Sequence, residues 1–174
     1  MKYSIVFPGQ GSQSLGMISE LRSNFSIVNE IFQEASDAIN LDLWKIINED
    51  QELLNLTKNT QPVMLTAGFA TYKVLAGEVN LMPISIAGHS LGEYTALVTS
   101  GSLGFFDAVQ LVRKRAELMQ AAVPNGSGSM AAILGLDDAR VIEICSIANE
   151  IGVVEAVNFN SPGQVVIAGE KNAV

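Results

Sequence analysis

The sequence contains a single cysteine, Cys145, and a single histidine, His89. One cysteine permits no internal disulfide and no metal site built from several thiolates, so we expect no metal centre of that kind. A chain without disulfides suits a reducing compartment, and we expect a cytoplasmic protein. One histidine also restricts the choice of base for any reaction that requires one.

Long apolar runs are absent as well. The longest runs extend over a few residues, far fewer than the roughly 20 that a membrane-spanning helix needs. Residues 1–8 contain one lysine and too short an apolar stretch for a signal peptide. We therefore expect no membrane partner and no secretory leader.

Charged residues make up 16% of the 174 residues and are mostly acidic, giving a formal net charge of −8 at pH 7. An excess of negative charge repels the phosphate backbone of nucleic acids, so we expect no nucleic acid partner. Hydrophobic residues make up 48%, which predicts a sizeable folded core. The length suits one domain, or one domain and part of another.

Short apolar strands alternate with amphipathic helices, a pattern typical of an α/β fold with a mostly parallel sheet. The pattern predicts strands over 3–7 and 84–87, and helices over 25–39, 43–47, 60–76, 93–100 and 105–122. We expect Thr60 to cap the helix over 60–76 with Pro62 in its first turn, and Gly101 to end the helix over 93–100. The helix over 105–122 is predicted to bury Phe105, Val109, Val112, Ala116 and Met119.

A cluster of turn-forming residues at 124–129 predicts a domain boundary, with one domain over 1–126 and a second over 127–174. The second domain is predicted to contain a strand over 130–134, a helix over 137–149 and strands over 153–159 and 164–168. This β-α-β-β order is the first part of a ferredoxin-like unit, which needs another helix and strand. Cys145 is predicted to be a small core residue of the helix, and the acidic run 49–52 a solvated face.

The segment Gly88-His89-Ser90-Leu91-Gly92 lies between a predicted strand and a predicted helix. A nucleophile on so sharp a turn has a strained backbone, and the flanking glycines let neighbouring elements approach closely. The turn would raise the Ser90 hydroxyl above the sheet and direct the Leu91 N–H toward developing negative charge. The alternative is that Ser90 only caps the helix.

The loop Gly9-Gln10-Gly11-Ser12-Gln13 has two interpretations. A dinucleotide-binding loop needs G-x-G-x-x-G, but Ser14 occupies the position of the third glycine. Alternatively, backbone donors or the Gln10 amide complete an oxyanion hole beside Ser90, because such loops converge at the carboxyl edge of a parallel sheet.

Two further residue types bear on the chemistry. Arg113 and Arg115 both flank the apolar stripe of their helix, so periodicity alone does not choose between them, and either one suits a solvated face. A nucleophilic serine needs a base, usually a histidine. His89 is adjacent to Ser90, and neighbours on a tight turn point their side chains apart, so we expect His89 to pack at the turn rather than act as the base.

Four segments in the same order resemble motifs of the bacterial malonyl-CoA:acyl carrier protein transacylase family, and the resemblance covers the whole chain. They are FPGQGSQ at 7–13, TQP at 60–62, GHSLGEY at 88–94 and NFNSPGQ at 158–164. The resemblance implies an α/β-hydrolase-like, doubly wound, mostly parallel sheet domain with an inserted ferredoxin-like small domain, incomplete in these residues.

The resemblance also implies roles for particular residues. Ser90 would be the acyl-accepting nucleophile, with Gln10 and the Leu91 N–H contributing to the oxyanion site. Arg115, rather than Arg113, would pair with the malonyl carboxylate. Gln61 and Asn160 would line the same pocket.

The implied activity is transfer of a malonyl group from malonyl-CoA to the phosphopantetheine thiol of acyl carrier protein, in fatty acid biosynthesis. Coenzyme A would be part of the substrate, with no metal or redox cofactor. The family's base histidine follows the small domain, so we expect it beyond Val174 and expect little turnover from these residues alone. The resemblance leaves malonyl and methylmalonyl open.

Two other classes of function stay open from the residues. A serine hydrolase, such as a thioesterase or a patatin-like lipase, also places G-x-S-x-G after a strand. A nucleotide-binding module or an inactive binding fragment, built around the Gly9 loop, is the non-enzymatic alternative.

Overall fold

The computed structural model describes residues 2–123 and 126–174 and divides into two compact units, Met1–Gln120 and Ala121–Val174. Each unit has its own hydrophobic core. Part of the turn cluster that predicts the boundary, residues 124–125, lies outside the described residues.

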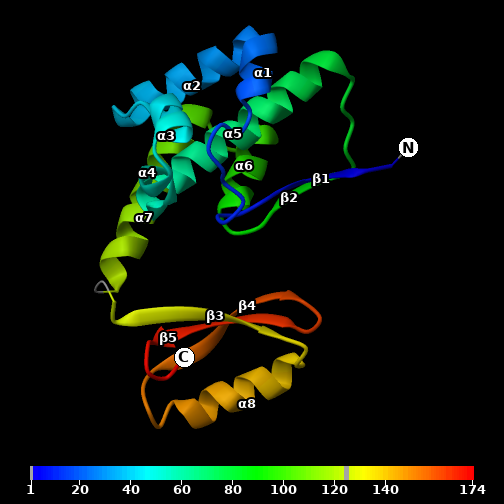
Figure 1. The fold of residues 1–174 in the computed structure, drawn as a ribbon. Helices are drawn as coiled ribbons and strands as arrows, with labels where there is room; N and C mark the ends of the chain where they lie inside the picture. Colours follow the sequence, from blue (N-terminus) through cyan, green and yellow to red (C-terminus); the bar gives the residue numbers. More distant parts are fainter. Residues whose placement is uncertain (1, 124–125) are drawn as a thin grey trace. The chain divides into compact units, whose positions relative to one another are not determined.

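The first unit combines a pair of parallel strands with helices, which confirms the α/β class (Figure 1). Its elements are β1 (Ser4–Phe7), α1 (Ser19–Asn24), α2 (Ser26–Ile39), α3 (Leu43–Glu49), α4 (Gln51–Asn55), α5 (Thr57–Glu78), β2 (Ser85–Gly88), α6 (Leu91–Thr99) and α7 (Phe105–Ala122). β1 pairs with β2 from Ser4 opposite Ser85 to Phe7 opposite Gly88. Both strands therefore end together, and the segments that follow them lie side by side.

Helix α5 is the centre of this unit. Every residue from Asn59 to Ala67 is buried, as expected for a helix that is surrounded by other elements. Helix α2 packs on it with Val28, Ile31 and Phe32, which are among the buried residues of the same core. Because α5 is enclosed, its buried polar side chains need partners within the protein.

The start of α5 differs from the prediction. The helix begins at Thr57, with the apolar Leu56 in the N-cap position, so Thr60 is not the cap. Thr60 is fully buried, and its hydroxyl donates to the carbonyl oxygens of Leu54 (2.6 Å) and Leu56 (3.1 Å). Pro62 consequently lies deeper in the helix than its first turn.

Two other sequence predictions need correction. Met119 is 49% exposed, because it lies one turn beyond Ala116, the last buried residue of α7. Within the acidic run 49–52, Asp50 is more than a solvated charge, since its carboxylate accepts a hydrogen bond from the Leu53 N–H and caps α4. Gly101 does follow the end of α6, with a φ of 76° and an N–H that donates to the Val98 carbonyl.

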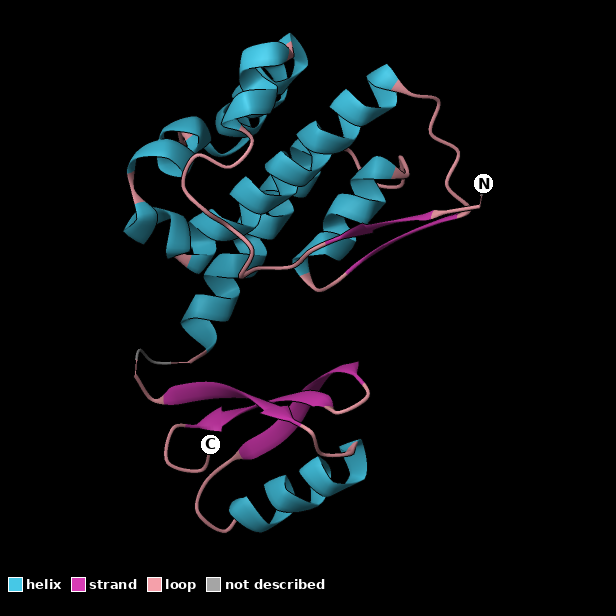
Figure 2. Ribbon diagram, turned by 45° about the vertical axis from the view of Figure 1, so that its right-hand side comes forward, coloured by secondary structure: helices cyan, strands magenta, loops and turns pink. Residues whose placement is uncertain are grey.

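The second unit is an antiparallel sheet with one helix on it (Figure 2). Its elements are β3 (Gly128–Leu134), α8 (Asp138–Ala148), β4 (Val154–Ser161) and β5 (Gln164–Glu170). The strand order β3-β5-β4 places the third strand between the first two, as in the opening β-α-β-β of a ferredoxin-like unit. Cys145 lies in the core of this unit with Val141 and Val165, as predicted.

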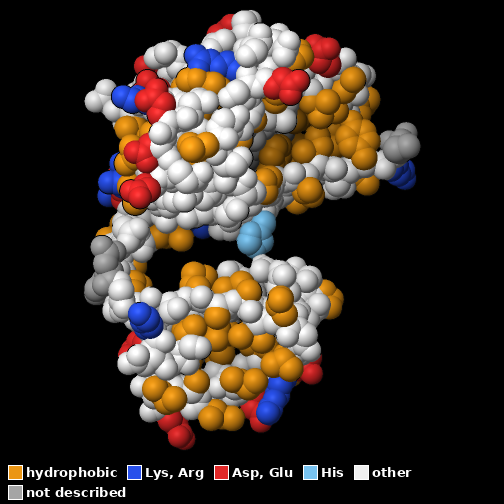
Figure 3. Space-filling model, in the orientation of Figure 1, with side chains coloured by type: hydrophobic (Ala, Val, Ile, Leu, Met, Phe, Trp, Pro, Cys, Tyr) orange, Lys and Arg blue, Asp and Glu red, His pale blue; other side chains and the backbone are white. Residues whose placement is uncertain are grey.

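β1 and the segment that leads into β2 leave apolar side chains exposed (Figure 3). Val6, Met82 and Ile84 are 73%, 73% and 66% exposed.

In the part of the chain that the structure describes, no helix combines the length and apolar character needed to cross a membrane.

Candidate active site

Ser90 lies in the turn that joins β2 directly to α6. Its backbone has φ 52° and ψ −109°, a conformation that residues with a side chain rarely adopt. The Gly92 N–H donates to the His89 carbonyl and the Glu93 N–H to the Ser90 carbonyl, so the helix starts at once. The hydroxyl is therefore held at the N-terminal end of α6, where the backbone N–H groups favour negative charge.

The two glycines that flank the turn are required by close approach. A Cβ atom on Gly88 would lie 1.9 Å from the Gly92 carbonyl carbon, and a Cβ on Gly92 would lie 2.2 Å from the Phe7 carbonyl oxygen. Both distances are far below van der Waals contact, so β1, the turn and α6 can meet only if these positions lack side chains.

Arg115 reaches this turn from α7. Its Nη2 donates to the Ser90 Oγ at 3.1 Å, and its Nη1 donates to the Gln61 Oε1 at 2.7 Å. The guanidinium carbon also lies 5.6 Å from the centre of the Tyr94 ring, within the range of a cation–π contact. Three helices, α5, α6 and α7, thus bring a hydroxyl, an amide and a guanidinium together.

Arg113 has a different position. Its Nη1 donates to the Lys58 carbonyl (3.0 Å) and to the Asn59 Oδ1 (2.9 Å), and its Nε pairs with Glu117. These contacts tie α7 to the first turn of α5. Of the two arginines that periodicity left open, Arg115 is the one that contacts Ser90.

Gln61 is 1% exposed, and both ends of its amide have partners. Its Oε1 accepts from Arg115, while its Nε2 donates to the Met119 Sδ at 3.4 Å. The sequence interpretation treated Met119 only as a core residue and missed this contact. The available signal was the spacing of four residues between Arg115 and Met119, which places both on one face of a helix.

The loop after β1 lies against the Ser90 turn. A Cβ atom on Gly9 would be 2.9 Å from the His89 carbonyl oxygen and 3.0 Å from its Nδ1. The Gln10 side chain is exposed and its Nε2 donates to the Thr57 Oγ1 at 3.2 Å. Participation of Gln10 in an oxyanion site stays a prediction. The same holds for Leu91, whose N–H belongs to the first residue of α6.

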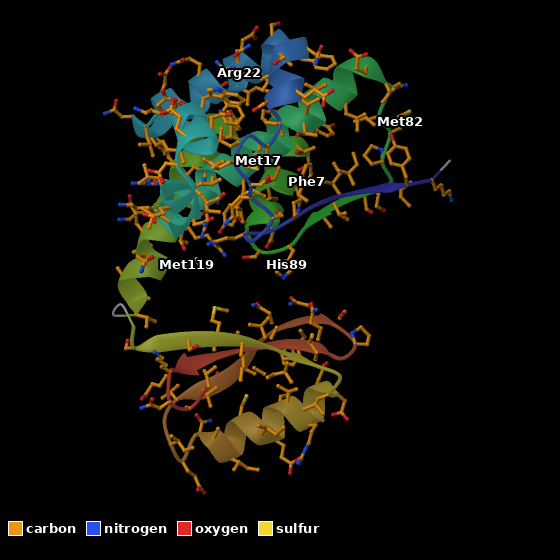
Figure 4. The ribbon with its side chains drawn as sticks, viewed as in Figure 1. Phe7, Met17, Arg22, Met82, His89 and Met119 are labelled. Atoms are coloured by element: carbon orange, nitrogen blue, oxygen red, sulfur yellow. The ribbon has the colours of Figure 1, made fainter. Side chains whose placement is uncertain are left out.

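His89 projects from the turn, next to Gly9, and is exposed (Figure 4). Its backbone N–H donates to the Phe7 carbonyl at 3.1 Å, which fixes the turn to β1. The ring lies beside Gly9 but is exposed, so the packing expected for His89 at the turn is only partial.

Asn160 belongs to the second unit. It is exposed on β4, and the register of β4 against β5 shifts between Phe159 and Ser161, so Asn160 lies at a bulge. Its predicted place in the Ser90 pocket stays a prediction. Over residues 2–123 and 126–174, no group of three or more His, Cys, Asp or Glu side chains is arranged to hold a metal ion.

The arrangement around Ser90 suits one kind of chemistry. A guanidinium donates hydrogen bonds but accepts none, and its planar fork matches the two oxygens of a carboxylate. Arg115 contacts the Ser90 hydroxyl. A substrate whose anionic group binds the Arg115 guanidinium would therefore lie beside that hydroxyl. The helix N-terminus beside the hydroxyl favours an oxyanion formed when Ser90 attacks a carbonyl.

Known protein sequences and solved structures match nearly the whole chain. The sequence pattern of the acyl transferase domain matches residues 4–174. The malonyl CoA-acyl carrier protein transacylase of Salmonella typhimurium is 53% identical over 174 residues, which cover 99% of this chain and 56% of that protein.

Solved structures of proteins with similar names also resemble this chain. The acyl-carrier-protein S-malonyltransferase from Burkholderia pseudomallei is 55% identical with a TM-score of 0.94, over 99% of this chain and 56% of that one. A malonyl-transacylase in complex with a type II PKS acyl-carrier protein is 47% identical with a TM-score of 0.95, again over 99% and 56%. The chain spans a little over half the length of these relatives.

Proposed function

The chain belongs to the acyl transferase domain family, and we propose that the protein transfers a malonyl group from malonyl-CoA to acyl carrier protein through a Ser90 ester. In the first step the Ser90 Oγ attacks the thioester carbon, the C–S bond breaks, and coenzyme A leaves as the thiol. In the second step the phosphopantetheine thiol of the carrier attacks the ester and Ser90 regains its proton. This reaction supplies malonyl groups to fatty acid synthesis.

The observation that carries the proposal is the contact of Arg115 with both Ser90 and Gln61. A malonyl group has a carboxylate two bonds from the carbon that is attacked. A guanidinium beside the nucleophile supports recognition of that carboxylate, because the fork can bind both oxygens. An acetyl group would leave the guanidinium without this partner, and the resulting discrimination can reach on the order of 10⁴-fold.

The proposal needs no metal and no redox cofactor, since each step exchanges one acyl bond for another. Coenzyme A enters only as part of the substrate. The Leu91 N–H and the Gln10 amide are proposed as donors to the oxyanion, and Gln61 and Asn160 as residues that line the pocket. Gln61 supports this role by its bond to Arg115.

The proton of Ser90 needs an acceptor. Arg115 cannot accept it, and the only histidine of these 174 residues is the neighbouring His89. We propose that the base is a histidine outside residues 1–174, and that residues 1–174 alone turn over slowly.

The test follows a labelled malonyl group through the complete protein. Malonyl-CoA labelled in the acyl group is mixed with the protein and with acyl carrier protein that bears phosphopantetheine. We expect label on the carrier and little free malonate. Steady release of malonate that does not need the carrier would indicate a serine hydrolase and contradict the proposal.

A further inference from the structure

Gln61 is held at both ends by residues of one helix face. Arg115 and Met119 are four residues apart on α7, and they contact the two opposite ends of the Gln61 amide on α5. The Arg115 Nη1 lies 2.7 Å from the Gln61 Oε1, and the Gln61 Nε2 lies 3.4 Å from the Met119 Sδ. With Gln61 1% exposed, bulk water does not replace either partner.

The hydrogen-bonding properties of the two partners fix the orientation of the amide. Arginine only donates, so the oxygen of Gln61 must face it, whereas a thioether only accepts, so the NH₂ group must face Met119. A rotated amide would set its N–H groups against the guanidinium and its oxygen against sulfur. Both contacts would be lost in a buried place, where an unpaired polar group costs free energy.

The orientation of Gln61 bears on Arg115 directly. One nitrogen of the guanidinium is anchored on Gln61, and the other lies at Ser90. Without an oxygen at Gln61, Arg115 loses the partner that keeps its fork aimed at the nucleophile. Because the fit of fork and carboxylate is directional, a turned guanidinium would bind a carboxylate poorly.

We propose that Met119 is a positioning residue, whose thioether orients the Gln61 amide and thereby holds Arg115 in place for the carboxylate of the acyl group. This role rests on the proposed function. Met119 is 49% exposed and lies beyond the last buried residue of α7, so filling the core does not account for its contact (Figure 4).

The experiment compares loading of two acyl groups onto the complete protein. Limiting malonyl-CoA or acetyl-CoA is added, and the rate of adduct formation is read from the intact mass. We expect Met119→Leu, which keeps the side-chain size but removes the acceptor, to slow malonyl loading by about tenfold and to leave acetyl loading within about twofold. Met119→Gln, whose carbonyl can accept from Gln61, restores the malonyl rate.

The neighbouring Leu118 is 57% exposed, and Leu118→Met is the control that should change neither rate. An unchanged malonyl-to-acetyl ratio in Met119→Leu overturns the role of Met119, as does an equal loss for both groups or failure of Met119→Gln to restore the ratio. If the unaltered protein loads no malonyl group, the proposed function itself fails. That outcome is distinct, because it is seen before any variant is made.

Discussion

Ser90 differs from the other residues with unusual backbone angles. Of the three non-glycine residues with positive φ in the described segments, Ile18 (φ 60°, ψ 9°) and Asn40 (φ 49°, ψ 48°) occupy the left-handed helical region. Ser90, with ψ −109°, lies outside it. Such a conformation costs of order 1–3 kcal/mol and persists where the surrounding structure imposes it. Here the close approach of β1 and α6 imposes it.

Replacing Ser90 by glycine should therefore stabilise the protein. We expect Ser90→Gly to raise the free energy of unfolding of the first unit by about 1 kcal/mol. The relief of backbone strain in the folded state exceeds the cost of the greater backbone entropy that glycine gives the unfolded chain. Unfolding in urea is followed by the fluorescence of Trp44, the single tryptophan, which packs on the core of this unit. Ser90→Ala is the control, because it also removes the hydroxyl but keeps the strain. Equal stability of the two variants would contradict this account.

The two arginines of α7 should have separable effects. We expect Arg115→Ala to reduce the preference for malonyl over acetyl loading by at least about 100-fold, because the carboxylate loses its partner. Arg113→Ala should leave that preference unchanged and lower the stability by about 1–2 kcal/mol, since the Asn59 Oδ1 and the Lys58 carbonyl lose their donor. Loading assays and urea unfolding of both variants check this. A changed preference in Arg113→Ala would be evidence against the assignment.

The residues near Ser90 show which features of the site can be predicted from the sequence and which cannot. The Ser90 turn has a local signature, because glycines must flank it. Periodicity could not separate Arg113 from Arg115, since both lie beside the apolar stripe. Only the packing of α7 against its neighbours decides which of the two contacts Ser90. The contact of Met119 with Gln61 joins residues 58 apart in sequence on two helices, and only the spacing of Met119 from Arg115 pointed toward it.

At the scale of elements, α5 and α7 are joined by a bond that replaces one lost within α5. Pro62 has no N–H, so the carbonyl four residues earlier, that of Lys58, has no donor within the helix. The Arg113 Nη1 donates to that oxygen at 3.0 Å. The predicted start of α5 at Thr60 was wrong for a related reason, because placing Pro62 in the first turn ignored a donor from another helix.

The junction of β1, the Ser90 turn and α6 should be intolerant of any side chain at Gly92. We expect Gly92→Ala to destabilise the first unit by about 3 kcal/mol or more, because its Cβ would lie 2.2 Å from the Phe7 carbonyl oxygen.

Gly77→Ala is the matched control for that substitution. Gly77 lies in α5 with open space around its Cβ position, and alanine there should stabilise by about 0.5–1 kcal/mol. Trp44 fluorescence in urea measures both variants. A mild effect at Gly92 would show that the junction is looser than these distances indicate.

At the scale of the whole molecule, each unit has its own hydrophobic core and its own residue with which unfolding of that unit can be followed. Trp44 packs on the core of the first unit, and Cys145 lies in the core of the second. Burial, and to a lesser extent the nearby Glu155 carboxylate, raises the pKa of the Cys145 thiol above its usual range. The alternation of strands and helices predicted the α/β class, whereas the core of each unit depends on packing between segments that are distant in the sequence.

Cys145 should react slowly with iodoacetamide at pH 8 in the folded protein. The thiol is buried and its raised pKa keeps it protonated, so labelling needs opening of the second unit. Because the folded pKa exceeds the unfolded one, the associated stability is present below the unfolded value, about 8.5, and is lost as pH rises through the folded value. Mass spectrometry of labelling against urea and pH measures this, with Cys145→Ser as the unlabelled control. Fast labelling of the folded protein would contradict it.

The central claim is that Ser90 accepts a malonyl group beside Arg115. The most direct measurement mixes the complete protein with malonyl-CoA, digests it and locates the adduct by mass spectrometry. We predict a malonyl group on the peptide that contains Ser90, and none on the Ser90→Ala protein. An adduct that survives Ser90→Ala, or a malonyl group located on another residue, would contradict the claim.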